Sequence, residues 1–214
     1  MSKNELYPKV FTWLFIGLLV TFLTGYSLSL NLDLVAKILT GGSYLILIIL
    51  ELGIAILFSL KLSNMSKTTA TICYLLYSFI TGLTFSTIFI AYQLTSIMLV
   101  FLVAAIVFGL FALIGYTTKK DISSWSSFLF MALLAIIIIT IINMFLNIES
   151  LDLIITVISV LLFLGYIIYD MKKVEMLTAY NEEAGPIYGA FQLYLDFINI
   201  FVDLLRLFGK AKDN

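Results

Sequence analysis

The segment 193–209, LYLDFINIFVDLLRLFG, is apolar enough to enter a membrane, yet it carries Asp196, Asp203 and Arg206. A charged side chain at the centre of a bilayer costs roughly 2.5–3.5 kcal/mol on insertion scales, so a helix that faces lipid would not keep three of them. We therefore expect this segment to be a helix enclosed by other apolar helices.

The rest of the chain has a composition that fits such a bundle. Of the 214 residues, 62% are hydrophobic and 12% are charged, whereas a soluble domain carries about 25% charged residues. Runs such as LLAIIIITII do not alternate between polar and apolar residues, as the strands of a membrane β-barrel would. The fold class predicted from composition is an all-α integral membrane protein.

Seven segments are long and apolar enough to cross a bilayer, which takes about 20 residues. They comprise residues 10–30, 43–61, 69–92, 96–116, 125–146, 151–170 and 187–208. The connections between them are short, so residues 1–214 are predicted to form a single domain of seven transmembrane helices. Pro8 and Pro186 stand just before the first and last segments, where a helix start tolerates proline.

The distribution of basic residues predicts the orientation in the cell membrane. With seven crossings, one side receives Lys3, Lys9, Lys61, Lys67, Lys119, Lys120, Lys172 and Lys173. The other side receives Lys37, Arg206, Lys210 and Lys212. Because cytoplasmic loops carry the excess of basic residues, the N-terminus is predicted to be cytoplasmic. If the last segment were re-entrant, its basic end would also be cytoplasmic, and the sequence leaves that open.

Charge and residue usage exclude several classes of function. The net charge of −1 and the lack of a basic patch make nucleic acid an unexpected partner. Cys73 is the single cysteine, so an intrachain disulfide or a cysteine metal cluster is excluded, and we expect no cofactor. The chain has no histidine, so any response to pH near neutrality must come from carboxylates.

Besides Asp152 at the start of the sixth segment, four acidic residues of the apolar segments are not explained as solvated loop charges. Glu51 is near the centre of the second one and must face the interior, carry a proton or pair with another helix. It could also be a protonated acid that links two helices by a hydrogen bond. Asp170 ends the sixth segment in GYIIYDMKK, where a surface carboxylate beside two lysines is the simpler interpretation.

The last segment places its polar side chains on one stripe. At about 100° per residue, roughly 80° of arc holds Tyr188, Gln192, Asp196, Asn199, Asp203 and Arg206. Asp203 and Arg206 are three residues apart and can pair, whereas Asp196 has no basic residue within reach on its own helix. Such a stripe is typical of an inner helix that lines an ion path. A polar network that only fixes helix packing is the alternative.

The sequences GYIIYDMKKVE and LYLDFINIFVDLLRLFG resemble the end of the Bax inhibitor-1 or TMBIM (transmembrane Bax inhibitor motif) family, and are most similar to its bacterial YetJ-type members. GYTTKKDISSWSSF and LEL, with Glu51, are similar to earlier segments of that family. The resemblance implies a fold in which six helices surround a central C-terminal helix. It also implies an activity as a pH-sensitive calcium leak channel.

The resemblance further implies roles for individual residues. Asp170 and Asp196 would form the aspartate pair that joins the sixth and seventh helices and controls the path. Glu51 would occupy the acidic position of the second helix. YetJ-type members place an arginine near the cytoplasmic end of that helix, but the nearest basic residue here is Lys61, one position out of register. Lysine lacks the planar fork that holds two carboxylates. Asp203 stands where an amide is more usual.

These residues suit calcium chemically. Ca²⁺ takes six to eight oxygen ligands, so Asp170 and Asp196 are the candidate Ca²⁺ contacts. Glu51, Asp203 and Asn199 would line the path or attract ions, with Lys61 and Arg206 as charge partners. Two carboxylates close together in a low dielectric do not both ionise easily. A protonated pair can share a hydrogen bond, and an ionised pair repels, so our hypothesis is that this equilibrium gates the path.

Other functions compete with a leak. Intramembrane aspartyl proteases also use two aspartates, but their second one lies in a Gly-x-Gly-Asp setting that YLDF lacks, so we do not expect an enzyme. A proton-coupled Ca²⁺/H⁺ transporter uses buried carboxylates equally well. A non-conducting membrane regulator is the third possibility. Calcium ions, protons and the lipid bilayer are the expected partners, and the sequence indicates no protein partner.

Overall fold

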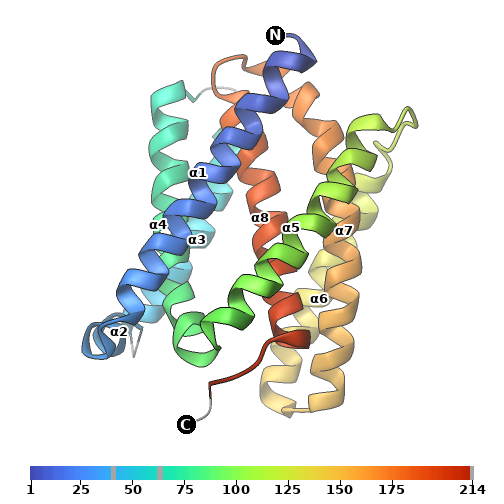
Figure 1. Cartoon of the computed structure of the whole chain (residues 1–214). Coiled ribbons are helices and arrows are strands. Elements are labelled where there is room, and N and C mark those ends of the chain that lie inside the picture. The colour runs from blue at the N-terminus through green and yellow to red at the C-terminus, as the bar shows by residue number, and fades with distance from the viewer. Residues whose placement is uncertain (40–41, 62–64, 213–214) are drawn as a thin grey trace. The chain divides into compact units, whose positions relative to one another are not determined.

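The computed structural model describes residues 1–39, 42–61 and 65–212, and Figure 1 shows its helices. These are α1 (Lys3–Ser29), α2 (Leu32–Leu39), α3 (Gly42–Lys61), α4 (Lys67–Ala91), α5 (Leu94–Thr117), α6 (Trp125–Leu146), α7 (Glu149–Tyr180) and α8 (Gly185–Phe208). The described residues form no strand, and an isolated bridge joins Tyr92 to Ala211. The all-α prediction is confirmed.

Each of the predicted segments overlaps one long helix, and α2 is an additional short helix that was not predicted. Five helices are long and apolar enough to cross a membrane: α1, α4, α5, α6 and α7. In α3 the apolar run Leu45–Phe58 is shorter, and α8 carries three charged residues. The chain is therefore a multi-helix membrane protein, and the crossings of α3 and α8 stay predictions.

Helix α1 begins at Lys3 because polar residues cap it ahead of its apolar part. The backbone N–H of Ser2 donates to Glu5 Oε2 at 3.1 Å, as in a capping box. Pro8 consequently lies inside α1, so the prediction that it precedes the helix is wrong. The hydrogen bond that Pro8 cannot donate would have gone to the carbonyl of Asn4, an exposed residue of the first turn that solvent can reach.

Helix α7 has 32 residues and continues ten residues beyond Asp170, where the predicted segment ends. The predicted end marked the loss of hydrophobicity, but the residues that follow contain neither Gly nor Pro. Met171, Val174 and Thr178 are buried along this extension, so packing stabilises it. Asp170 is consequently an interior residue of a helix rather than a residue at its end.

Tertiary contacts divide the chain into two compact units. Unit 1 comprises Met1–Leu94, Val174–Tyr194 and Ala211–Asn214, and unit 2 comprises Thr95–Lys173 and Leu195–Lys210. Both α7 and α8 pass from one unit to the other. The prediction of a single transmembrane domain stays a prediction.

In unit 1, α1 and α4 pack through small residues spaced one turn apart. The buried small residues are Gly17, Thr21 and Gly25 on α1, and Ser78, Gly82 and Ser86 on α4. A Cβ atom at Gly82 would lie 2.6 Å from Thr24 Cβ and 2.9 Å from the carbonyl oxygen of Thr21. Close backbone approach of this kind is a common means of helix association in membranes, where apolar side chains gain little by leaving lipid.

The first half of α8 is packed among aromatic rings of unit 1. The ring of Phe191 lies 4.6 Å from that of Phe58 on α3 and 5.0 Å from that of Tyr77 on α4. The hydroxyl of Tyr194 lies 2.6 Å from Thr21 Oγ1, which also donates to the carbonyl of Ser78 at 2.9 Å. These contacts hold α8 against α1, α3 and α4.

The two ends of unit 1 are defined by polar contacts. At one end, Glu175 of α7 pairs with Lys3 Nζ at 2.6 Å and accepts a hydrogen bond from the Tyr7 hydroxyl at 2.8 Å. Asn181, between α7 and α8, donates to the carbonyl of Met65 at 2.9 Å, just before α4 starts. At the other end, the backbone N–H of Lys212 donates to the carbonyl of Ala91 at 2.9 Å, where α4 finishes.

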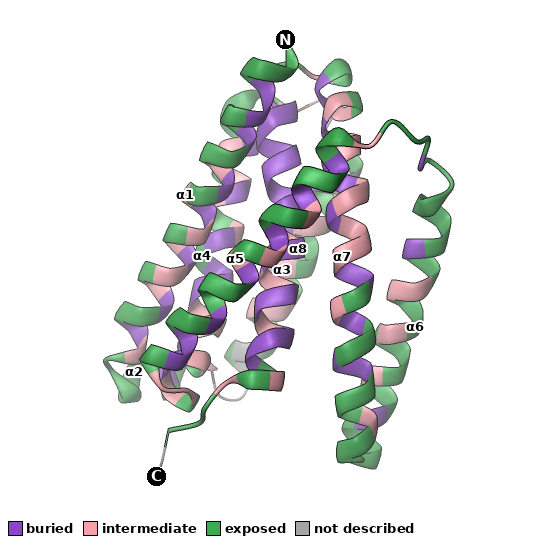
Figure 2. Cartoon of the chain, turned by 45° about the vertical axis from the view of Figure 1, so that its right-hand side comes forward, coloured by how far each residue is buried: buried purple, intermediate pink, exposed green. Residues whose placement is uncertain are grey.

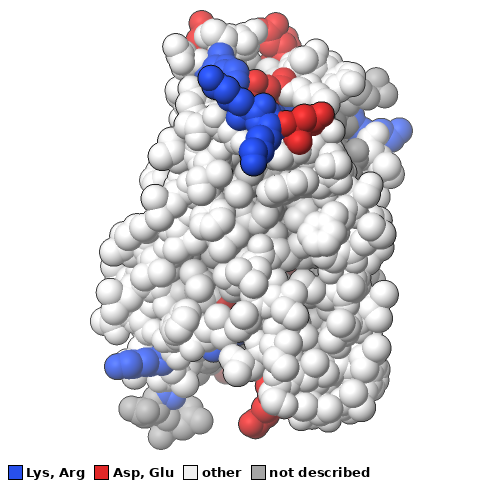
Figure 3. All heavy atoms as spheres, turned by 90° about the vertical axis from the view of Figure 1, so that its right-hand side faces the viewer, with Lys and Arg blue, Asp and Glu red and all other residues white. Residues whose placement is uncertain are grey.

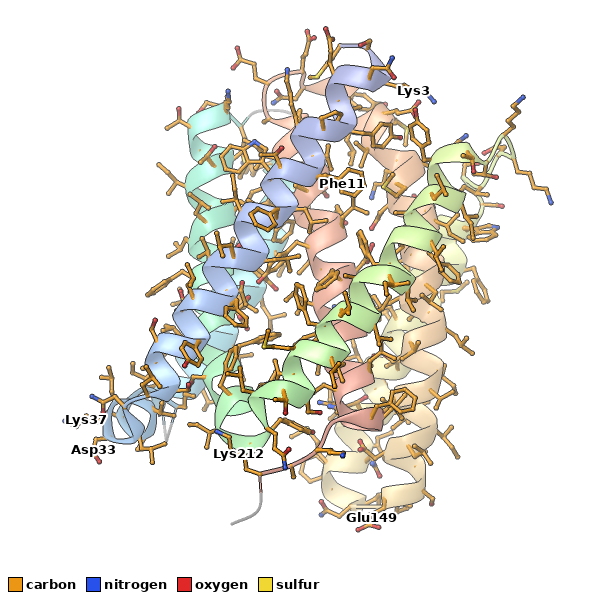
Figure 4. All side chains as sticks on the ribbon, viewed as in Figure 1. Lys3, Phe11, Asp33, Lys37, Glu149 and Lys212 are labelled. Atoms are coloured by element: carbon orange, nitrogen blue, oxygen red, sulfur yellow. The ribbon has the colours of Figure 1, made fainter. Side chains whose placement is uncertain are left out.

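Figure 4 shows Lys3 at the start of α1, with Asp33 and Lys37 of α2 beyond the far end of that helix. The residues that flank α8 therefore lie at opposite ends of α4. With 24 residues, α8 is about 36 Å long, enough to cross a hydrocarbon core of about 30 Å.

Unit 2 contains α5, α6, most of α7 and the second half of α8. A Cβ atom at Gly115 of α5 would lie 2.7 Å from Met171 Cβ, so α5 and α7 pack closely. Phe197 of α8 fits between Phe101 and Phe108 of α5, with ring centroids 5.2 and 5.6 Å away. Figure 2 shows α6 as mostly exposed, and its described buried residues are Leu129 and Asn143. We expect its exposed apolar face to contact lipid.

Candidate functional site

Two aspartates are buried within unit 2. Asp170 on α7 and Asp196 on α8 are each 3% exposed, and their charges lie within electrostatic reach of each other. Tyr166, one turn before Asp170, lies near both carboxylates. Unit 2 thus brings together the two aspartates that the family resemblance pairs, and it buries Asp170 where the simpler interpretation of the sequence placed a surface carboxylate.

The basic residue that acts on this pair within unit 2 is Lys173. It lies three residues beyond Asp170 on α7, and its charge attracts both carboxylates. Its Nζ is 5.6 Å from the centroid of the Tyr169 ring, close enough for a cation–π contact. Lys173 is half-buried, so water only partly screens its charge from the pair.

Asp196 carries an oxygen that the surrounding residues do not satisfy. Its Oδ2 is buried and forms no hydrogen bond with any described residue. A buried ionised oxygen without a partner is costly, so such atoms usually bind a proton, a water molecule or an ion. The pair thus offers an oxygen that can accept a proton, a water molecule or a cation.

Asp203 lies two turns further along α8 and is also buried. Its carboxylate faces Ser159 of α7 and lies within the electrostatic reach of Arg206 and Asp152. Its Oδ2 forms no hydrogen bond with any described residue. Arg206 is exposed, and no ion pair shorter than 4.0 Å joins it to Asp203 among the described residues. The structure therefore places Asp203 against α7 rather than in a close pair on its own helix.

The remaining residues of the predicted path have other neighbours. The amide of Asn199 donates to the carbonyl of Leu195 at 2.7 Å, so it is held by its own helix. Glu51, in unit 1, is half-buried and lies near Thr81, Tyr77 and Tyr194. Glu51, Tyr77 and Tyr194 each direct a polar atom toward the Thr81 hydroxyl, but Thr81 Oγ1 forms no hydrogen bond of standard geometry with any described residue. Lys61 ends α3 and is exposed.

The acidic side chains of the described residues are not gathered into a metal cage. No three Asp, Glu, Cys or His side chains within residues 1–39, 42–61 and 65–212 are close enough to hold a metal ion together. Two carboxylates supply only part of the six to eight oxygens that Ca²⁺ takes. The pair alone therefore does not complete a Ca²⁺ coordination shell.

Comparison with known proteins gives the family. Residues 3–213 match the family described as "Inhibitor of apoptosis-promoting Bax1". The chain belongs to the Bax inhibitor-1 family. It is 37% identical to the inner membrane protein YbhL of Escherichia coli over 212 residues, which cover 95% of this chain and 91% of YbhL.

The chain is also similar to two uncharacterized proteins of other bacteria. An uncharacterized protein of Borreliella burgdorferi is 34% identical over 221 residues, which cover 100% of this chain and 95% of the relative. An uncharacterized membrane protein of Streptococcus pyogenes is 36% identical over 141 residues, which cover 64% of this chain and 62% of the relative. The family match over residues 3–213 thus includes all of the segments that carry the resemblance in the sequence.

Sequence reasoning placed two lysines beside Asp170 but did not predict that Lys173 acts on the buried pair, and it missed Ser159 and Tyr166. Lys173 follows Asp170 at a spacing that brings helical neighbours together, so that signal was present in the sequence. The pattern of YetJ-type proteins indicates Lys61 instead. Ser159 and Tyr166 gave no comparable signal, because their proximity to acidic residues of α8 depends on how α7 is rotated.

Proposed function

We propose that this protein is a pH-sensitive calcium leak channel of the cell membrane, gated by protonation of Asp170 and Asp196. The observation that supports the proposal most is the buried Oδ2 of Asp196, which has no partner among the described residues and lies beside a second buried carboxylate. Membership of the Bax inhibitor-1 family supports the same function.

The proposed transmembrane arrangement has seven crossings, with six helices around α8 and the N-terminus in the cytoplasm. The apolar length of five helices supports most of these crossings. For α8, the positions of Asn181 and Lys212 at opposite ends of α4 favour a full crossing over a re-entrant helix. In this arrangement Asp196 and Asp203 face helices rather than lipid, which would otherwise make their charges costly.

The gate works through the charge of the pair. When one carboxyl is protonated, the two groups share a hydrogen bond and hold α7 against α8. When both are ionised they repel each other, since the low dielectric screens them poorly. The ionised oxygens then also attract Ca²⁺, which favours carboxylate ligands. We therefore expect the leak to increase as pH rises and the pair loses its proton.

Calcium flux in liposomes tests this function. Purified protein would be reconstituted with a calcium indicator inside the vesicles, and flux would be measured at several pH values around neutrality. Asp170→Asn and Asp196→Asn remove the ionisable groups and keep their shape, so most of the pH dependence should disappear. Asp33→Asn, at an exposed residue of α2, is the matched control and should keep it.

The same experiment contains the outcomes that would reject the proposal. A pH dependence that persists in both variants would remove the aspartate pair as the gate. Calcium accumulation against its own gradient, driven by a proton gradient, would identify a Ca²⁺/H⁺ transporter instead. Vesicles without any calcium flux would leave a non-conducting regulator as the function. We assign no catalytic residue and no cofactor in any of these cases.

A further inference from the structure

An apolar groove lies between α6 and α7 within unit 2. Its volume is about 510 Å³, within the range of about 300–1,000 Å³ that is usual for ligand sites. Leu129 and Leu162 form its buried floor, and the exposed side chains of Phe128 and Leu161 are among its walls. Gly165 has no side chain and leaves space above Leu129, whose Cδ2 would lie 3.2 Å from a Cβ added there.

The groove reaches the N-terminal end of α6, where its lining becomes polar. Ser124 and Trp125 line it at that end. Trp125 is 39% exposed, and tryptophan is enriched at the level where a bilayer meets water. The groove thus has an apolar body along the helices and a polar mouth at the expected membrane surface.

The connection between α5 and α6 brings positive charge to this mouth. Lys119 and Lys120 are exposed and precede Ser124 by a few residues. Lys172 of α7 donates from Nζ to the carbonyl of Thr118 at 2.7 Å, which ties the connection to α7. The backbone N–H of Ser123 donates to Asp121 Oδ1 at 2.9 Å, which lowers the pKa of that carboxyl and keeps it ionised.

The connection that leads to the mouth, together with Lys172, thus carries three ammonium groups and one carboxylate, and its net charge is positive. Figure 3 shows basic and acidic side chains beside one another on one face of the molecule, with uncharged residues over most of it. A basic site at the membrane surface next to a groove between transmembrane helices matches the headgroup and acyl chain of an anionic lipid. A zwitterionic lipid has no net charge, so the excess of lysines would not strengthen its binding in the same way.

We propose that the α6–α7 groove binds one anionic phospholipid, with an acyl chain along Leu129, Leu162 and Gly165 and the phosphate beside Lys119 and Lys120. The site is distinct from Asp170 and Asp196, and binding of the lipid can be measured without calcium flux. Success or failure of this proposal is therefore independent of the proposed leak.

Native mass spectrometry of the purified protein tests the charge requirement. Adducts with phosphatidylglycerol and with phosphatidylcholine would be titrated in the same detergent. Phosphatidylglycerol should bind more tightly, and the double change Lys119→Gln with Lys120→Gln should weaken its binding about tenfold, because each lysine near an anionic headgroup contributes several-fold. The matched control, Lys9→Gln with Lys67→Gln, removes the same charge from exposed residues of unit 1 and should leave phosphatidylglycerol binding unchanged.

A second pair of variants tests the groove itself. Ala132→Phe places a ring in the groove and should remove the bound phosphatidylglycerol, whereas Ala135→Phe adds the same ring to an exposed position of α6 outside the groove. The proposal is overturned if the lysine changes leave the preference for phosphatidylglycerol intact, or if both phenylalanine variants bind it equally. It is also overturned if inorganic phosphate displaces the lipid completely. The same holds if Ala132→Phe alters the oligomeric state but leaves phosphatidylglycerol bound.

Discussion

At the scale of single residues, the contact between α1 and α4 depends on the absence of side chains at particular positions. Gly17 lies against Tyr74, whose hydroxyl donates to the carbonyl of Trp13 at 3.0 Å. Gly82 lies against the backbone of Thr21. In both places another helix occupies the space that a side chain would need, so these glycines are required for packing rather than for backbone flexibility.

Gly82→Ala is expected to destabilise the protein by about 1–3 kcal/mol, because the added Cβ would lie within 3.0 Å of atoms of α1 and the helices must move apart. The free energy of unfolding can be measured by denaturant titration in detergent micelles. Gly53→Ala is the matched control, since a Cβ there would meet nothing within 4 Å. An equal loss of stability in both variants would show that the close contact of α1 and α4 is unimportant.

The aspartates show at the same scale what a sequence can reveal about a site. The unusual charges of α8 were visible in the sequence because carboxylates are rare in apolar helices. The burial of Asp170 was not visible, since a carboxylate beside two lysines reads equally well as a surface group. Its burial follows from the continuation of α7, which encloses Asp170 within a packed helix.

At the scale of elements, the extension of α7 is joined to the start of α1. Glu175 accepts from Tyr7 and pairs with Lys3, and Met1 pairs through its amino group with Glu182 at 3.0 Å. These polar contacts surround a small cavity of about 350 Å³ in unit 1. The extension is thus stabilised by its contacts with another helix rather than by its own sequence alone.

Glu175→Gln is expected to loosen this extension by about 1 kcal/mol, because the charge-assisted contacts with Lys3 and Tyr7 are weakened while the shape is kept. Hydrogen exchange of the backbone amides of residues 174–180 is the measurement, and exchange should become faster. High salt should reduce the difference from the wild type, because it screens the partly exposed ion pair.

Glu183→Gln removes one charge from an exposed residue of the α7–α8 connection and is the matched control for that experiment. It should leave the exchange rates of residues 174–180 unchanged. If Glu175→Gln also leaves them unchanged, the contacts with α1 do not stabilise the extension.

At the scale of the whole molecule, the membrane topology can be tested by labelling single cysteines in a Cys73→Ser background. In intact cells, an impermeant thiol reagent should label Asp33→Cys and Lys212→Cys from outside. Lys120→Cys and Glu183→Cys should be labelled only after the membrane is permeabilised, because the lysine excess predicts that both residues are cytoplasmic.

In that experiment, the labelling of Lys212→Cys shows whether α8 crosses the membrane completely. Its backbone hydrogen bond to Ala91 places it at the end of α4 opposite to Met65, so labelling from outside is expected if α8 crosses completely. If Asp33→Cys were labelled from outside but Lys212→Cys only after the membrane is permeabilised, α8 would be re-entrant. If Lys120→Cys and Glu183→Cys were labelled from the same side as Lys212→Cys, the prediction of seven crossings would be contradicted.

The sequence by itself determined the membrane class, the approximate positions of the long helices and the family. Hydrophobic length and charge depletion decide the first two, because a bilayer accepts only long apolar segments whose backbone is fully hydrogen-bonded. The motifs around YD and YLDFIN indicated the family, and the family match over residues 3–213 confirms it.

Only the tertiary structure decided the start of α1 at Lys3, the extension of α7 to Tyr180 and the neighbours of each buried acid. Helix ends depend on caps and on packing with other helices, neither of which hydrophobicity records. The neighbours of Asp196 and Asp203 depend on how α7 and α8 are rotated about their axes, and both rotations follow from contacts between residues far apart in the sequence. The charges of segment 193–209 are visible in the sequence, but only the fold shows which side chains face them.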